Sequence, residues 1–309
     1  MLESRPAEVS LIEVGPRDGL QNETKVLTAE IKARFIKELA AAGLKTIETT
    51  SFVRADKIPQ MGDANSLYAL VKNLKGVDLP CLVPNEMGLD NALGSGVKHI
   101  AVFTATSDTF NKKNTNVTMK ESFDRIGPVM DRAHKENLKI RGYISTVFGC
   151  PYEGKTSVDR LIEVVEFYLK HGADEISVGD TIGVATPIQI KSIIKELKAV
   201  TELKKIAMHF HDTRSMAMVN TLTSLELGIT RFDSSAGGLG GCPYAKGATG
   251  NAATEDLVYL MHSLGIKTGI DLDLLAKASQ YILGELGRET QSKVLKAYLA
   301  SKDTTPCPF

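Results

Sequence analysis

Apolar and polar residues recur in an arrangement in which a helix-like run ends at a glycine and a β-prone segment follows. The glycines are Gly43, Gly96, Gly172 and Gly228, and the segments that they open read GLKTIE, GVKHIA, GADEIS and GITRFD. A glycine directly after a helix supplies the left-handed position at which many helices end. The alternation after each glycine is typical of a buried strand. The pattern therefore predicts four helix-to-strand units.

Four further β-prone segments lie between these units. They read VSLIEV at residues 9–14, LPCLV at 79–83, KIRGYISTV at 139–147 and IAMHFH at 206–211. One strand–helix unit takes roughly 30 residues or more, so each interval between the glycines holds about two units. Eight alternating units predict an α/β fold, a closed (βα)8 TIM barrel. An open doubly wound sheet is the alternative, but no GxGxxG motif follows the first strand to support it.

The whole chain, residues 1–309, is predicted to be a single catalytic domain. We expect the barrel over residues 1–270 and a helical extension over 271–309, because the tail reads LLAKASQYILGELGRETQSKVLKAYLASK. These extra helices either close one end of the barrel or form a subunit contact. The second alternative corresponds to a homodimer or larger homo-oligomer.

Composition narrows the class of partner. The 37 basic and 37 acidic side chains cancel, which gives no reason to expect nucleic acid or an acidic membrane surface as a partner. No segment approaches the roughly 18 apolar residues of a membrane span, and the start shows no signal sequence. The four cysteines form no CxxC pair, so we expect reduced thiols and a cytoplasmic location. The partner expected is a small molecule.

The unusual polar residues fall where the predicted strands end. In TIM barrels the active site lies at the C-terminal ends of the strands. The residues found there are Arg17 and Asp18 after the first strand, Glu48 at the second, Asp180 at the sixth, His209 and His211 on the seventh, and Cys242 and Asn251 in the Gly-rich loop after the eighth. Four isolated histidines, His99, His134, His171 and His262, receive no function.

His209 and His211 are the strongest metal signal. Residues i and i+2 of a strand point to one face, so both imidazoles should converge on one point. Two core histidines are the alternative, but the interior of such a barrel is mostly branched and apolar. Together with Asp18 and Asn251 they form a mixed nitrogen and oxygen set, which suits Mg²⁺ or Mn²⁺ and permits Zn²⁺.

Each remaining residue has a structural alternative. Arg17 could be a surface charge, and Asp18 could be a turn residue, since Asp-Gly is a turn dipeptide. Glu48 on a buried strand needs a partner, so an ion pair with Arg17 competes with catalysis. Asp180 could be an N-cap or a supporting group near the metal.

Two residues of the last loop also have alternatives. Asn251 directly precedes AATEDLVYL, and this spacing favours an N-cap of the following helix. Cys242 could be a small buried apolar residue, but its glycine neighbours favour a mobile loop that brings a thiol over the site. A divalent ion near Arg17 and Glu48 could polarise a hydroxyl or carbonyl and stabilise an enolate. The reaction class is therefore carbon–carbon bond cleavage or formation beside a carbonyl.

The motifs EVGPRDGLQNE, IETTSFV, PQMGD, GCPYEG, GDTIGVATP, HFHDT and GLGGCPYAKGATGNAATEDLVYL resemble the 3-hydroxy-3-methylglutaryl-CoA lyase family, bacterial type. The resemblance extends from Val9 to about Lys293, and GLGGCPYAKGATGN is its most specific element. It implies a TIM barrel that uses Mg²⁺ or Mn²⁺ to split hydroxymethylglutaryl-CoA, an acyl-CoA, into acetyl-CoA and acetoacetate in leucine catabolism and ketone-body formation. The alternative is a Claisen-type condensing enzyme, or a lyase for a related 3-hydroxyacyl-CoA. A third alternative is a catalytically silent metal-binding scaffold.

The resemblance also assigns roles to individual residues. It implies that the metal ligands are Asp18, His209, His211 and Asn251, which raises Asn251 above its capping alternative. Arg17 would bind substrate and steady the thioester carbonyl, Cys242 would be an acid or base, and Glu48, Asp180 and His209 would support proton handling. Arg214, Ser215 and Met216 depart from the Tyr-Gly-Gln of several family members. That departure leaves the ligands intact and bears on acyl-chain selectivity.

Overall fold

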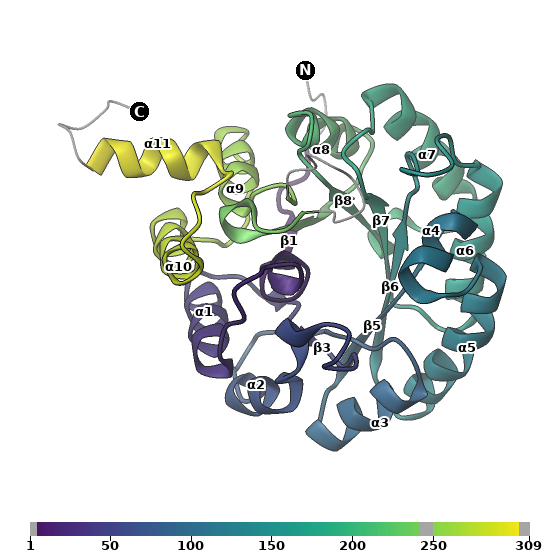
Figure 1. Ribbon diagram of the computed structural model, residues 1–309. Helices are drawn as coiled ribbons and strands as arrows, with labels where there is room; N and C mark the ends of the chain where they lie inside the picture. The colour runs from purple at the N-terminus through teal and green to yellow at the C-terminus, as the bar shows by residue number, and fades with distance from the viewer. Residues whose placement is uncertain (1–4, 242–249, 303–309) are drawn as a thin grey trace.

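The computed structural model describes residues 5–241 and 250–302 (Figure 1). The strands are β1 Ser10–Glu13, β2 Thr46–Ile47, β3 Thr50–Ser51, β4 Cys81–Leu82, β5 His99–Ala105, β6 Lys139–Ser145, β7 Glu175–Asp180, β8 Ile206–Phe210 and β9 Arg231–Ser234. The helices are α1 Ala29–Ala41, α2 Ala64–Val71, α3 Glu86–Ser95, α4 Asp108–Thr115, α5 Met119–Lys135, α6 Val158–Lys170, α7 Pro187–Val200, α8 Ala217–Glu226, α9 Thr254–Ser263, α10 Leu272–Leu286 and α11 Lys293–Lys302. Short helical turns are η1 Gly15–Gly19, η2 Pro59–Met61, η3 Leu203–Lys205 and η4 Ala236–Gly238.

All strands pair in parallel, in the order β2-β1-β9-β8-β7-β6-β5-β4-β3. The two ends of this order, β2 and β3, are parts of one stretch of chain separated by Glu48 and Thr49. Glu48 N donates to Glu13 O on one side, and Thr49 N donates to Pro80 O on the other. The sheet therefore closes on itself, and Figure 1 shows the helices as an outer ring around it.

The predicted (βα)8 barrel is confirmed, and each of the eight predicted segments overlaps a strand. The four glycines of the repeat, Gly43, Gly96, Gly172 and Gly228, all have positive φ, between 79° and 106°. This is the left-handed conformation that glycine adopts without steric cost. The repeat in the sequence is thus the helix-ending turn that leads into alternate strands.

The apolar core lies between the strands and the helices. It includes Leu39, Ile47, Val102, Ile140 and Val178, all fully buried. Helix α5 shows how an outer helix begins: Thr118 and Glu121 form a capping box, which satisfies free backbone N–H groups of the first turn. The barrel interior differs from this apolar layer, because charged and polar side chains line it.

The two last helices follow the eighth strand–helix unit. Helix α10 packs against α1, and α11 packs against α9. Figure 1 shows α11 outside the helical ring, next to α9 and α10. In the described part of the chain, no helix combines the length and the apolarity that crossing a membrane requires.

Candidate metal and catalytic site

The turn η1 carries two of the predicted site residues, Arg17 and Asp18. It is a π-helical turn directly after β1, in which Gly19 N donates to Val14 O. Gly15 leaves room for this turn, because a Cβ atom at this position would lie 2.5 Å from the Glu13 carboxylate and 3.1 Å from Ser235 Oγ. Gly15 N instead donates to that carboxylate at 2.8 Å. The turn, purple in Figure 1, thereby places Arg17 and Asp18 at the end of β1.

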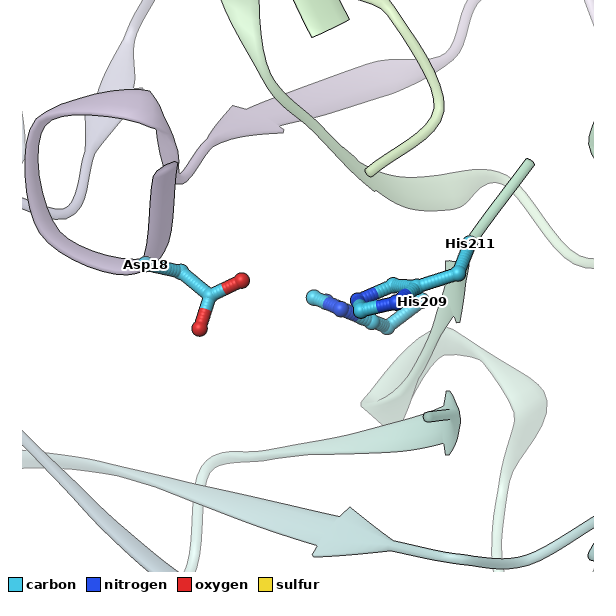
Figure 2. Close-up of side chains that lie close together, drawn as sticks. All are labelled: Asp18, His209 and His211. Atoms are coloured by element: carbon cyan, nitrogen blue, oxygen red, sulfur yellow. The ribbon is translucent and has the colours of Figure 1, made fainter. Parts of the chain in front are cut away.

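His209 and His211 converge as the strand period predicts. Their ring centroids lie 5.3 Å apart, and both residues are buried. One oxygen of Asp18 and a ring nitrogen of each histidine lie within 4.8 Å of one another. Figure 2 shows the Asp18 carboxylate facing the two imidazoles from the opposite side. Three of the four predicted metal ligands therefore form one group that could hold a metal ion.

Asn251 joins this group, and its capping alternative is wrong. Helix α9 begins at Thr254, its N-cap is Ala253, and no side chain caps it. Asn251 instead pairs through its backbone with His211, which keeps the chain extended before the helix. Its amide nitrogen donates to Asp18 Oδ2 at 2.9 Å and to Leu239 O at 3.1 Å. The side chain therefore lies next to the other three predicted ligands.

The chemistry of this group fits a divalent cation. Asn251 Oδ1 and His211 Nδ1 are buried and have no hydrogen-bond partner in residues 5–241 and 250–302, an unfavourable state for polar atoms. Burial raises the pKa of Asp18, but the positive charge of Arg17 and the two nearby imidazoles have the larger effect. Together they lower the pKa of Asp18 to about 2. Burial and the proximity of His209 lower the pKa of His211 to about 4. Near neutral pH the carboxylate is ionised and the His211 imidazole is neutral, as metal ligands must be.

Arg17 lies between two carboxylates. Its guanidinium contacts Asp18 at 2.9 Å and Glu48 at 2.8 Å, and it lies 5.2 Å from the centre of the Tyr143 ring. Tyr143 donates a hydrogen bond to Glu48 at 2.9 Å. Burial raises the pKa of Glu48, and Arg17 opposes that rise. The ion pair considered for Glu48 is present, while its catalytic role stays a prediction.

Asp180 lies at the end of β7 with both carboxylate oxygens occupied. Oδ1 accepts from Val184 N at 2.9 Å, and Oδ2 accepts from Ala185 N at 3.0 Å. These bonds tie the loop after β7 to the strand. The geometry favours a role in holding that loop, and a catalytic role for Asp180 stays a prediction.

Two other predicted features lie in loops. Cys242 falls outside the described residues. Arg214, Ser215 and Met216 lie between β8 and α8, as expected, and Arg214 donates to Ile182 O and Gly183 O at 3.0 and 3.1 Å. Ser215 has φ of 56°, a left-handed conformation that favours glycine. The departure from the family pattern therefore places a serine in a left-handed conformation directly after Arg214, which contacts the loop that Asp180 holds.

Sequence reasoning missed the buried polar residues inside the barrel. Asp233 accepts hydrogen bonds from His209 and Ser177 and pairs with Arg141. Glu13 accepts from Gly15 N, from Ala236 N at 2.9 Å and from Thr254 Oγ1. The one available signal was position, because Glu13 and Asp233 are acidic residues that directly follow an apolar residue on a strand.

Comparisons with known proteins agree with this architecture. Residues 8–282 match the model of the family described as HMGL-like. Human mitochondrial hydroxymethylglutaryl-CoA lyase is 45% identical over 292 residues, which cover 94% of this chain and 90% of that protein. The crystal structure of an HMG-CoA lyase from Bacillus subtilis is similar with a TM-score of 0.93 and 44% identity, covering 96% of this chain and 99% of that one. An HMG-CoA lyase from Acinetobacter baumannii, solved with coenzyme A and 3-methylmalate, has a TM-score of 0.92 and 35% identity and covers 98% of both chains.

Proposed function

Because the chain belongs to the HMGL-like family, we propose that it is a metal-dependent carbon–carbon lyase that cleaves 3-hydroxy-3-methylglutaryl-CoA to acetyl-CoA and acetoacetate. The observation that carries this proposal is the 45% identity to a hydroxymethylglutaryl-CoA lyase over 94% of the chain. The site supports it, since the predicted ligands and Arg17 lie together at the ends of the strands. A relative binds coenzyme A, which supports an acyl-CoA as the substrate class.

Asp18, His209, His211 and Asn251 would hold the metal ion. Oxygen and imidazole ligands without a thiolate favour Mg²⁺ or Mn²⁺, with Zn²⁺ as the remaining alternative. A divalent cation bound there supplies Lewis-acid polarisation of a substrate hydroxyl or carbonyl oxygen. The low pKa values of Asp18 and His211 keep both side chains ready to bind it without prior loss of a proton.

Arg17 would bind the thioester carbonyl of the substrate. Its two terminal nitrogens are taken by Asp18 and Glu48, but Nε is buried and has no partner in the described part of the chain. This Nε–H is a fixed donor that a carbonyl oxygen could meet. When the bond between C2 and C3 breaks, its electrons form the enolate of acetyl-CoA, and the guanidinium stabilises that charge.

Two protons must move in this reaction. The C3 hydroxyl loses one as acetoacetate forms, and C2 of the enolate gains one to give acetyl-CoA. We assign one transfer to Glu48, which is supported by its raised pKa and by a buried Oε1 without a partner among the described residues. We assign the other transfer to Cys242, with His209 as the alternative. Asp180 would act by holding the loop after β7.

The test is acetoacetate release from hydroxymethylglutaryl-CoA, measured in a coupled assay with Mg²⁺ or Mn²⁺ and again with chelator. Metal-dependent release supports the proposal. A faster reaction with a related 3-hydroxyacyl-CoA would show that the Arg214 loop has changed the acyl specificity. Net condensation under the same conditions would indicate the Claisen-type alternative. Turnover no higher than in chelator for every acyl-CoA would indicate a silent scaffold.

Cys242→Ser tests the thiol. A hydroxyl has a much higher pKa than a thiol, so we expect loss of most activity with unchanged Mn²⁺ affinity and unchanged thermal stability. A thiol reagent should inactivate the wild type, and a bound product analogue should protect it. Near wild-type turnover by the serine variant would remove Cys242 from the reaction. The cytoplasmic location and the oligomeric state stay predictions.

A further inference from the structure

Asp233 is a buried acidic residue to which the reaction proposed above gives no role. It lies on β9, and the residue is 2% exposed. Oδ1 pairs with Arg141, while Oδ2 accepts from Ser177 Oγ at 2.7 Å and lies 3.0 Å from His209 Nδ1. Both oxygens are therefore fully engaged by groups from three other strands. A buried carboxylate is tolerated only with such partners.

Strand register sets the contact between Asp233 and His209. The two residues are direct partners in the parallel pairing of β8 with β9. Neighbours at the same level of a sheet point to the same face, so both side chains enter the barrel interior. The Tyr143 ring meets the His209 ring edge-on at 6.4 Å. The imidazole is thus fixed by a hydrogen bond and by an aromatic contact.

The hydrogen bond determines which ring nitrogen of His209 can bind a cation. A neutral imidazole has one N–H donor and one lone-pair acceptor, and an ionised carboxylate can only accept. Facing Asp233, Nδ1 must carry the proton. The lone pair then lies on Nε2, the only other ring nitrogen and the one left to face Asp18 and His211.

We infer that Asp233 is a positioning residue for metal binding, which holds His209 in the Nδ1–H tautomer so that Nε2 is presented to the cation. Arg141 and Ser177 in turn hold the carboxylate. Asp233 touches no substrate atom, so its effect passes through His209. The inference rests on the metal site of the proposed function and adds a requirement that the ligands alone do not contain.

Asp233→Asn is the decisive variant, because it preserves shape but replaces one acceptor oxygen by an N–H donor. Arg141 presents only donors, so the amide oxygen must turn toward Arg141. The amide N–H₂ then faces His209 Nδ1, which must accept and therefore lose its proton. The proton moves to Nε2 and blocks the metal-binding lone pair. We expect Mn²⁺ affinity to fall about 10- to 100-fold.

The chain offers a control in a second histidine–carboxylate pair, in which the histidine is buried and the carboxylate is partly exposed. His99 Nδ1 lies 3.0 Å from Asp78 Oδ2, the same distance as in the Asp233 pair. His99 begins β5, at the N-terminal end of the barrel and away from the predicted ligands. Asp78→Asn should therefore change Mn²⁺ affinity less than twofold, which separates the effect on metal binding from a general cost of breaking a histidine–carboxylate pair.

Mn²⁺ affinity is measured by calorimetric titration of the whole chain. The tautomer is measured by the nitrogen-15 chemical shifts of the His209 ring, in protein with chelator and in protein loaded with Mg²⁺, at a pH high enough for the ring to be neutral. The His209→Gln variant identifies the His209 signals by their absence. We expect Nδ1–H in the wild type and Nε2–H in the chelated Asp233→Asn variant. A wild-type ring protonated on Nε2 overturns the inference, and this result does not depend on the variant folding.

Two further results overturn it: wild-type Mn²⁺ affinity in Asp233→Asn, or a wild-type protein that binds neither Mn²⁺ nor Mg²⁺. Failure of the proposed function is a separate result. A protein that binds Mn²⁺ in an Asp233-dependent way but cleaves no acyl-CoA keeps the positioning role and loses the lyase assignment.

Discussion

Arg17 is the residue at which binding and catalysis separate most clearly. Replacing it by Gln removes the positive charge and the buried Nε–H to which the proposed reaction assigns the developing enolate. Loss of one such oxyanion donor costs on the order of 100- to 1000-fold in rate, so we expect kcat to fall at least that far at saturating Mg²⁺. Mn²⁺ binding should survive, because Arg17 is not a ligand. Steady-state kinetics and a metal titration on the same preparation check both statements.

Arg17→Lys is the control for geometry. A lysine keeps the charge but not the planar fork that contacts Asp18 and Glu48 together. We expect little recovery of kcat. Full recovery by lysine, or less than a tenfold loss in the Gln variant, would contradict the role given to the Arg17 donors.

Glu13 makes the stability of the fold depend on pH. Burial outweighs its hydrogen bonds and raises its pKa from 4.5 to about 7. The folded state therefore holds the proton more tightly than the unfolded state, and the stabilisation from Glu13 is present below pH 4.5 and lost as the pH rises through 7. Between pH 5 and 8 the free energy of unfolding of the wild type should fall by roughly 2 to 3 kcal/mol more than that of Glu13→Gln. Urea denaturation in chelator at both pH values measures this difference.

The control for this pH dependence is Glu30→Gln. Glu30 is exposed in the first turn of α1, and local hydrogen bonds lower its pKa. Above pH 5 it is ionised in both states, so the stability difference from wild type should be the same at pH 5 and pH 8. If the stability difference between Glu13→Gln and the wild type were also the same at pH 5 and pH 8, Glu13 would already be ionised in the folded protein at pH 5.

Among the elements, the turn η4 lies backbone against backbone with Gly250, in the segment that leads into α9. A Cβ atom at Gly250 would lie 2.3 Å from Gly238 O and 2.9 Å from Leu239 O. Gly250→Ala must therefore displace η4 or the neighbouring Asn251. We expect destabilisation of about 1 to 3 kcal/mol, the usual cost of overpacking, and weaker Mn²⁺ binding. Urea denaturation and metal titration measure the two effects.

Gly284→Ala is the matched substitution in an open position. Gly284 is exposed on α10, and a Cβ atom there meets nothing within 4 Å. Alanine should leave metal binding unchanged and stabilise the fold by up to about 1 kcal/mol, because glycine is a poor helix residue. If both alanine variants behaved alike, close packing at Gly250 would not explain its effect.

At the scale of the whole molecule, metal binding should increase the thermal stability of the fold. The proposed ligands come from η1, from β8 and the residue directly after it, and from the segment before α9, so a cation would link the start and the end of the barrel. A ligand at 100 times its Kd stabilises the folded state by about 2.7 kcal/mol, and Mn²⁺ should raise Tm by a few degrees. His211→Ala should abolish that shift without unfolding the barrel. Differential scanning calorimetry with Mn²⁺ and with chelator checks it.

His262→Ala is the control for histidine removal. His262 is exposed at the end of α9 and contacts Thr268 rather than any proposed ligand. Its variant should keep the full Mn²⁺ shift in Tm. A shift that persists in His211→Ala would show that Mn²⁺ binds elsewhere.

Local rules of the chain were enough for the architecture and for part of the site. The glycine that ends a helix and the alternation that follows it predicted the strand–helix units, because both depend on neighbouring residues only. The convergence of His209 and His211 followed from the two-residue period of a strand. That Arg17 and Asp18 would meet them followed from a general property of barrels, whose strands all end at one rim.

Only the tertiary structure decided how buried polar groups are paired. Asp233 meets His209 because of the register of β8 with β9, and Asp180 turns its oxygens to the backbone of its own loop. Asn251 has the spacing of a helix cap, yet its side chain turns toward Asp18 on the opposite end of the chain. Such contacts join residues far apart in sequence, and their geometry depends on strand register and barrel closure. The register, unlike the closed barrel itself, is not encoded in a local pattern of polar and apolar residues.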